Sequence, residues 1–300
     1  MNTFNISANY TTSKIITMNK KIIALSVIAI LTGLLINAQE SFQSPKLTKV
    51  WEVTKGLDVA ESANFNPFDN TIYVSSIVGK FDEKDGIGYI SKINLNGEMI
   101  QKEWVKGLNG PKGMSFTKSK LYVTDEDRVL EIDVPSGKVL KEYKNSHSKD
   151  LNDIAITADG KVYVTDSGSD CLFMVGKDSL EIFIQSKNIE GMNGIYNDGS
   201  VIYIGSGGKL LSIDTNTKAI SVIATEVGYL DGLLKISKDI FLTSNWGGKV
   251  QLVTLGKNPE RLLESKTHAA DLGYVPSKQL LLVPTFTENT LVAYKLNFSK

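Results

Sequence analysis

Residues 151–166 read LNDIAITADGKVYVTD, which is a short apolar run, a turn containing Asp-Gly and a second, more apolar run rich in β-branched residues. This pattern is typical of a β-hairpin. The same order of elements recurs in five other stretches, namely residues 60–76, 110–125, 191–206, 229–244 and 269–284. Self-similarity at a fixed spacing is the signature of a repeat architecture.

Each copy carries a polar or charged residue just before or within its first strand. By alignment, the equivalent positions are Glu61, Lys112, Asn152, Asn193, Asp231 and Asp271. Successive steps are 51, 40, 41, 38 and 40 residues, and a polar insertion at 79–88 accounts for the longer first step. Short β-rich runs fill the rest of each unit, and almost no run has the 3.6-residue period of a helix. The repeats therefore predict an all-β, six-bladed β-propeller with four strands per blade.

The ends of the repeat region predict how the ring closes. The last unit supplies only about three strands before the chain ends, and an unassigned strand at 47–53 precedes the first unit. Pairing this strand with the last blade closes the ring and covers its exposed edges. A β-sandwich is the competing interpretation, but its strands would not repeat six times in register. We expect one propeller domain over residues 39–300.

The N-terminal segment has the features of a secretory signal peptide. An uncharged run of 15 residues, 22–36, follows Lys20 and Lys21 and ends before Ala38. The run is short for a transmembrane helix, although an uncleaved anchor or a buried helix is the alternative. We expect cleavage near Gln39, an N-terminal extension within residues 1–17, and an exported protein, periplasmic or secreted, with no membrane attachment after signal removal.

Composition excludes several classes of function. The chain has 33 basic and 33 acidic residues, and removal of residues 1–38 leaves 30 against 33, so a nucleic-acid partner is not expected. One cysteine, Cys171, excludes an internal disulfide, and two histidines exclude a three-histidine zinc site. We expect Cys171 to be buried and inert, and the three tryptophans to be packing anchors. The runs 124–125 and 165–167 are interpreted as turns that hydrogen-bond neighbouring backbone.

The aligned polar residues form a ring around the channel of the predicted propeller, because the first strand of each blade lines the axis. Three carboxylates and one lysine give the ring about two net negative charges, which raises carboxylate pKa values unless a cation is bound. Oxygen donors of Glu, Asn and Asp suit calcium best. The alternative is that these side chains only hydrogen-bond loops, with water at the axis.

Several of these residues resemble a known family. Glu61-Ser62, Asn152-Asp153, Asn193-Gly194, Asp231-Gly232 and the closing stretch 269–296 are similar to the senescence-marker-protein/gluconolactonase (regucalcin-like) family of six-bladed propellers. The resemblance implies one divalent cation, calcium by preference. It would be held by Glu61, Asn193 and Asp231 and approached by Asn152. It also implies a lactonase in which the cation polarises the carbonyl and Asp231 acts as general base.

Two positions depart from that family. An arginine that contacts substrate there is replaced by Asp150, and a proline after the first-blade glutamate is replaced by Ser62. We therefore expect a substrate pocket that differs from a sugar-lactone pocket. The candidate substrate-binding residues are Asn152, Lys112, Asp271 and His268.

Two of these candidates have alternative roles. Lys112 either orients an anionic substrate or, as we favour, neutralises Asp271. His268 either shuttles protons or is a surface residue. Two hypotheses for function follow: a metal-dependent hydrolase of a lactone or another ester, or a propeller that binds a small molecule or protein through a site with a structural metal.

Overall fold

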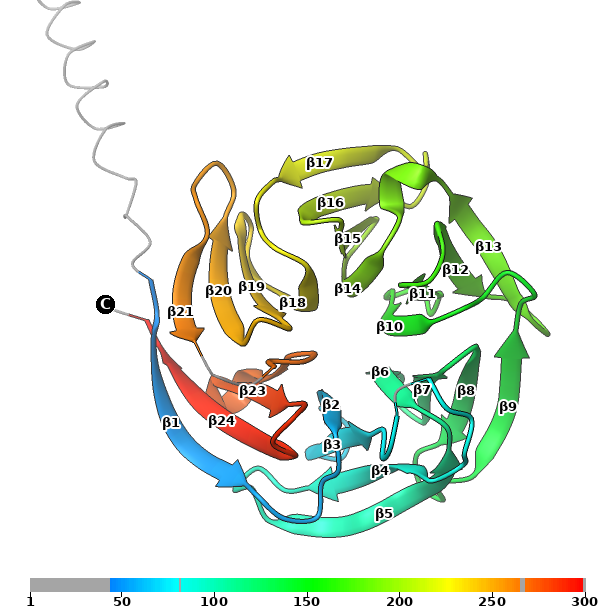
Figure 1. Cartoon of the computed structure of the whole chain (residues 1–300), viewed down its shortest axis with the longest axis vertical. Coiled ribbons are helices and arrows are strands. Elements are labelled where there is room, and N and C mark those ends of the chain that lie inside the picture. The colour runs from blue at the N-terminus through cyan, green and yellow to red at the C-terminus, as the bar shows by residue number, and fades with distance from the viewer. Residues whose placement is uncertain (1–43, 81, 265–267, 299–300) are drawn as a thin grey trace, which may run out of the picture. The chain divides into compact units, whose positions relative to one another are not determined.

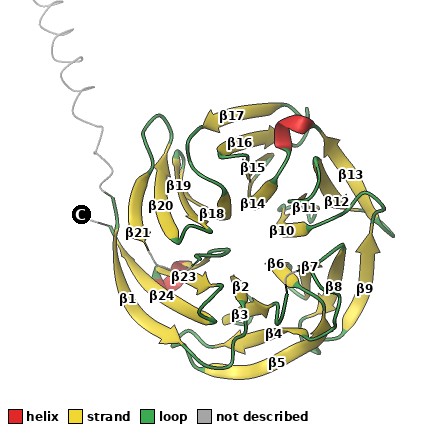
Figure 2. Ribbon diagram, viewed as in Figure 1, coloured by secondary structure: helices red, strands yellow, loops and turns green. Residues whose placement is uncertain are grey.

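The computed structural model describes residues 44–80, 82–264 and 268–298, and the predicted signal peptide lies outside them. From residue 45 onward, the described residues form one unit of six four-stranded antiparallel sheets arranged around an axis (Figure 1). The fold is the predicted all-β, six-bladed β-propeller. The described helical segments are two short 3₁₀ turns, η1 (Lys187–Ile189) and η2 (Pro276–Lys278) (Figure 2). Neither is long enough to cross a bilayer.

The first three blades each place their strands in chain order from the channel outward. Blade 1 contains β2 (Ala60–Asn66), β3 (Thr71–Ser76), β4 (Gly88–Ile93) and β5 (Met99–Leu108). Blade 2 contains β6 (Pro111–Phe116), β7 (Lys120–Asp125), β8 (Arg128–Asp133) and β9 (Val139–Lys144). Blade 3 contains β10 (Leu151–Ile156), β11 (Val162–Asp166), β12 (Cys171–Val175) and β13 (Leu180–Gln185).

The remaining blades are also built from the channel outward, and only the last one departs from chain order. Blade 4 contains β14 (Met192–Asp198), β15 (Val201–Ser206), β16 (Lys209–Asp214) and β17 (Ile220–Ala224). Blade 5 contains β18 (Leu230–Ser237), β19 (Ile240–Asn245), β20 (Lys249–Thr254) and β21 (Glu260–Glu264). Blade 6 contains β22 (Gly273–Val275), β23 (Leu280–Thr285), β24 (Thr290–Asn297) and β1 (Lys46–Val53).

The ring closes as the sequence predicts. β1 is the outermost strand of blade 6 and pairs antiparallel with β24, from Lys46 opposite Asn297 to Val53 opposite Leu291. Trp51, on β1, also fastens blade 6 to blade 1, because its indole Nε1 donates a hydrogen bond of 3.1 Å to the Leu95 carbonyl.

Apolar side chains gather between the blades. In the described residues, each of six buried clusters combines residues from two neighbouring blades, as where Tyr73 of blade 1 packs with Leu121 of blade 2. Alternate residues of a strand point to opposite faces, so every blade presents an apolar face to each neighbour. Cys171 belongs to one of these clusters and is buried and free, as predicted, and burial raises the pKa of its thiol. The core is thus a ring of interfaces that leaves the axis to polar residues.

Candidate functional site

The innermost strands bring one residue from each blade to the same level of the channel. In blade 1, Ala60 pairs with Ser76 at the end of the second strand, and Glu61 follows it. Corresponding pairs are Pro111 with Asp125, Leu151 with Asp166, Met192 with Ser206, Leu230 with Asn245, and Ala269 with Thr285. We call the residues that follow these pairs the upper ring: Glu61, Lys112, Asn152, Asn193, Asp231 and Ala270.

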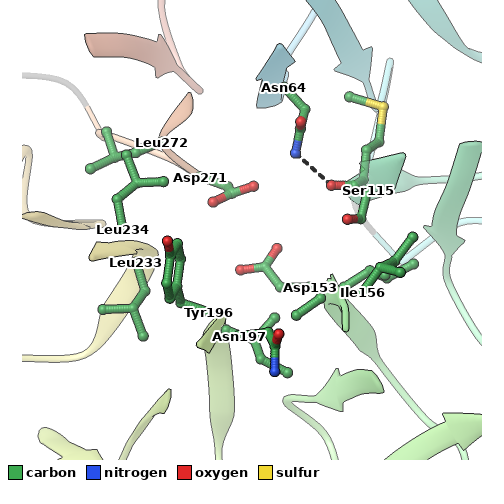
Figure 3. A pocket seen from close by; sticks show the side chains of 14 residues that line it. Asn64, Ser115, Asp153, Ile156, Tyr196, Asn197, Leu233, Leu234, Asp271 and Leu272 are labelled. Atoms are coloured by element: carbon green, nitrogen blue, oxygen red, sulfur yellow. Dashed lines mark hydrogen bonds between the residues drawn. The ribbon is translucent and has the colours of Figure 1, made fainter. Parts of the chain in front are cut away.

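The sixth member corrects the sequence alignment, which placed Asp271 at the level of Glu61. The strand pairing puts Ala270 there and Asp271 one position further along, where it forms a parallel bridge with Ser62. Asp271 therefore belongs to a second level, which we call the lower ring: Ser62, Gly113, Asp153, Gly194, Gly232 and Asp271. Its carboxylate lines a pocket together with Asp153 (Figure 3). Asp271 is not among the residues that line the pocket containing Lys112 and Asn152, two of the other predicted substrate residues.

That other pocket, which we call the upper pocket, opens at the upper ring. It has a volume of about 170 Å³. Its lining residues are Glu61, Ile77, Lys112, Asp150, Asn152, Ser167, Asn193, Trp246 and Phe286. Asp231 is 1% exposed and lies against Asn193 and Trp246, so it is at the base of the pocket wall. The structure therefore brings together Glu61, Asn152, Asn193, Asp231 and Lys112.

The oxygen atoms of this group lack hydrogen-bond partners. Five oxygen atoms of the group are buried and have no hydrogen-bond partner within the described residues: Glu61 Oε2, Asn152 Oδ1, Asn193 Oδ1 and both carboxylate oxygens of Asp231. Buried polar atoms are nearly always satisfied, and each one left without a partner costs about 1–3 kcal/mol. Several such acceptors at one end of a channel fit a bound cation that accepts their lone pairs.

The donor set also indicates what kind of cation fits. The described residues contain no group of three or more His, Cys, Asp and Glu side chains arranged to hold a metal, so a cation at the upper ring would also need the amide oxygens of Asn152 and Asn193. Two carboxylates with two amide oxygens form a hard, all-oxygen set that suits calcium and, less well, magnesium or manganese.

The raised pKa values of the buried carboxyl groups also fit a bound cation. Burial, then the nearby carboxylates of Asp231 and Asp271, raise the pKa of Glu61 well above its usual range. Burial and the charge of Asp271 raise the pKa of Asp231 to about 8, although nearby polar groups of Asn193 and Trp246 act in the opposite direction. Both carboxyl groups thus resist ionisation at neutral pH unless a positive charge compensates.

Lys112 does not supply that charge to Asp271, which corrects the favoured prediction. Its ammonium donates a hydrogen bond to Asp150 Oδ1 and lies 4.0 Å from Glu126 Oε1. Burial lowers the pKa of Lys112, but Asp150 and Glu126 outweigh burial and raise it overall. Burial also raises the pKa of Glu126 to about 7. Asp150, which replaces the arginine expected from the family, therefore engages the one basic residue of the described pocket lining.

The rim of the upper pocket was missed by sequence reasoning. Ile77, Ser167, Trp246 and Phe286 each follow directly after the second strand of a blade. Trp246 is 42% exposed and lines the pocket, so its interpretation as a packing anchor was wrong. The repeat contained the signal, because once the first two strands are paired in register, the next residue lines the upper pocket in four of the six units.

The neighbouring turn residues behave as predicted. Asp125 accepts hydrogen bonds from the backbone amides of Asn109 and Gly110, and Asp166 accepts them from Lys149 and Asp150. These carboxylates fix the loops that enter the next blade.

His268 lies beside the rim rather than in the described pocket lining. Its ring centroid is 5.2 Å from that of Trp246 and 6.4 Å from that of Phe286, and its Nδ1 is buried without a hydrogen-bond partner. Its contacts are thus with two aromatic side chains of the rim.

Comparison with known proteins adds to the evidence for the fold. No protein-family model matches the chain, and no curated protein is significantly similar to it. It is similar to a solved structure of catalytically inactive virginiamycin B lyase from Staphylococcus aureus with quinupristin, at 14% identity and a TM-score of 0.57 over 84% of this chain and 100% of that chain. The selenomethionine-substituted form of the same lyase gives 13% identity and a TM-score of 0.59 with the same coverage. At such low identity the likeness shows the fold alone, and the chain is a six-bladed β-propeller with that enzyme among its structural neighbours.

Proposed function

We propose that this chain is an exported hydrolase, dependent on a divalent cation of the calcium type, that cleaves a lactone or another ester in the upper pocket. The observation that carries the proposal is the set of unpartnered buried oxygens on Glu61, Asn152, Asn193 and Asp231. The sequence resemblance to the senescence-marker-protein/gluconolactonase family supports the same ligand set, and membership of that family is part of the proposal.

The roles of the residues follow from their chemistry. Glu61, Asn193 and Asp231 would hold the cation, with Asn152 as a further oxygen donor. When bound, the cation supplies a Lewis acid for a carbonyl oxygen. Asp231 would remove the proton from the attacking water. Trp246 and Phe286 would exclude bulk water and contact the apolar part of the substrate.

The pocket wall shapes the expected substrate class. Lys112 is held by Asp150 and Glu126, so it offers no free ammonium to an anionic group. Three of the four rim residues, Ile77, Trp246 and Phe286, are aromatic or aliphatic. Both features favour neutral, partly apolar esters or lactones over acidic sugars.

The same ion pair favours a second candidate function, a propeller that binds a small molecule or a protein without turnover and keeps the metal for structure. The Asp231→Asn variant discriminates between the two candidates in a panel of neutral esters and lactones. The hydrolase should lose at least about a hundredfold in kcat, which is typical for loss of a general base, while the variant remains folded by circular dichroism. Equal hydrolysis by both proteins contradicts the catalytic assignment, and absence of turnover in the wild type favours the binding function.

A further inference from the structure

A second pocket occupies the channel beyond the upper ring and has a volume of about 230 Å³. Its lining residues come one to four positions later along the chain than those of the upper ring. Polar side chains of Asn64, Ser115 and Asn197 line it, together with the carboxylates of Asp153 and Asp271 (Figure 3). We call it the lower pocket. None of the roles proposed above uses it.

Asp153 in this pocket has a buried carboxylate without a hydrogen-bond partner. Its side chain is buried, with 3% of the residue exposed, and neither Oδ1 nor Oδ2 has a hydrogen-bond partner in the described structure. It points into the lower pocket (Figure 3). A buried carboxylate without any donor is among the costliest groups to leave uncompensated.

Asp271 faces Asp153 across the axis. The two residues occupy the same lower ring on blades 3 and 6, which are opposite each other in a ring of six, and their carboxylates point toward the centre (Figure 3). Ser62 Oγ donates a hydrogen bond of 2.6 Å to Asp271 Oδ2 and holds that carboxylate in place. Asp153 and Asp271 thus place two carboxylates on opposite sides of the channel axis, and we call this pair the carboxylate clamp.

The neighbouring backbone leaves room for the carboxylate. A Cβ atom at Gly113 would lie 2.3 Å from Asp153 Oδ1 and 2.6 Å from Asp153 Cα. Only glycine fits at this lower-ring position next to Asp153. The clamp is therefore built into the packing of the channel and is more than two acidic side chains near a surface.

When the carboxyl groups of both rings are ionised, the charges in the channel do not cancel without a second cation. The two rings contain the carboxylates of Glu61, Asp231, Asp153 and Asp271, and the only lysine among them, Lys112, is engaged by Asp150. One divalent ion at the upper ring would leave two formal negative charges on the lower ring. From the opposed carboxylates and the unpartnered oxygens, we propose that Asp153 and Asp271 form a second cation site that takes a small divalent ion, with calcium as the first candidate. The proposal does not depend on the hydrolytic activity.

Calcium titration of the chelator-treated protein tests this proposal by isothermal calorimetry. The wild type should bind about two equivalents. Asp153→Asn and Asp271→Asn should each weaken one of them by roughly tenfold or more, because a charged oxygen donor is lost. The equivalent that remains shows that the variant is folded. Asp178→Asn, which removes an exposed surface carboxylate, is the matched control and should leave both equivalents unchanged.

The reciprocal variants separate this proposal from the proposed function. Glu61→Gln with Asp231→Asn should abolish the upper-ring equivalent and retain the Asp153–Asp271 one. Manganese soaked into wild-type crystals should give an anomalous peak between Asp153 and Asp271 in addition to one at the upper ring. A wild type that binds a single equivalent, unchanged in Asp153→Asn and Asp271→Asn, overturns the second site and leaves the upper one intact. In that case the two carboxyl groups share a proton.

Discussion

Asp150 accepts a hydrogen bond from the buried ammonium of Lys112, at the position where the resembling family has an arginine that contacts substrate. The pair turns a position that could recognise an anion into an internal ion pair of the pocket wall. Glu126, whose carboxylate lies 4.0 Å from the same ammonium, completes the group. This relationship leads to the first prediction.

Lys112→Met should destabilise the protein by about 2–3 kcal/mol, because it leaves Asp150 and Glu126 without their partner in a partly buried site. The loss is smaller than for a fully buried pair since the Asp150 side chain is 37% exposed. Urea unfolding at neutral pH measures it. Lys141→Met breaks the exposed pair with Asp178 and should cost less than about 0.5 kcal/mol. Equal effects of both variants would argue against the ion pair as a structural element.

Calcium should stabilise the protein, because a ligand that binds only the folded state raises the free energy of unfolding. At a free concentration of 100 times Kd, the gain is about 2.7 kcal/mol per site. Thermal melts with calcium and with excess chelator measure the shift. Glu61→Gln with Asp231→Asn should reduce the calcium-dependent shift, and a wild-type melting temperature that is indifferent to calcium contradicts a metal at the upper ring.

The stability of the metal-stripped protein should fall as pH rises from about 4 to about 8. Asp231 and Asp271 have folded-state pKa values of about 8 and about 7, against 3.8 for the ordinary group. Between these values the folded state binds more protons than the unfolded state, so each rise in pH favours unfolding. Urea unfolding in chelator at pH 5 and pH 8 provides the comparison.

The Asp231→Asn variant is the control for that pH dependence. Because asparagine does not titrate, the difference in stability between pH 5 and pH 8 should be smaller in the variant than in the wild type. An unchanged difference would mean that other groups cause it. Saturating calcium should reduce the same difference in the wild type, since a cation holds the carboxylates ionised in the folded state.

Trp246 should report on the upper pocket. Its side chain lies against Asp231 and is 42% exposed, so binding of a cation nearby changes the surroundings of the indole. Calcium titration should change the intrinsic fluorescence of the wild type. The change should be lost in Trp246→Phe and kept in Trp104→Phe, whose indole packs in the interface between blades 1 and 2. A signal that persists in Trp246→Phe would place the responsive tryptophan elsewhere.

Trp51→Ala should cost about 2–3 kcal/mol, less than a fully buried tryptophan, because Trp51 is only partly buried but joins blade 6 to blade 1. Guanidinium unfolding measures the loss. Val50→Ala, at a neighbouring position of β1 with 52% exposure, should be within about 0.5 kcal/mol of wild type. Similar losses for both variants would show that the strand matters only through its backbone.

Sequence periodicity was sufficient for the architecture. The repeat predicted six blades and the closing strand. It also placed Glu61, Lys112, Asn152, Asn193 and Asp231 at one level, because each lies near the start of an innermost strand whose pairing with the next strand is set by apolar residues. The predicted ring residue of blade 6 was wrong because the innermost strand of that blade is only three residues long and gives little pattern to align. In three of the other units a glycine directly follows the upper-ring residue and marks its position. Blade 6 has no glycine directly after Ala270 or Asp271, because Leu272 separates Asp271 from Gly273. The alignment could therefore be displaced by one residue, from Ala270 to Asp271.

The contacts between side chains of the site could not be predicted from the sequence. Whether the Lys112 side chain contacts Asp150 or Asp271 depends on its direction at the channel, and repeat spacing does not carry that information. The rim residues Trp246 and Phe286 directly follow the second strands of their blades, so the repeat locates them only once the register of the first two strands is fixed. The isolation of Asp153 is likewise a property of its surroundings and not of the residue itself.

The closing strand also has a consequence for the order of events during folding. The first strand of the domain needs a partner about 240 residues later in the chain, so blade 6 stays incomplete until β24 has been synthesised. Contacts between residues this distant in sequence slow folding. Until they form, the edge of β1 stays unpaired and can pair with other chains. The five complete blades are each made of consecutive strands and can form earlier. Ring closure is therefore the step at which newly made chains compete with aggregation, and once made it protects the folded ring from opening at its ends.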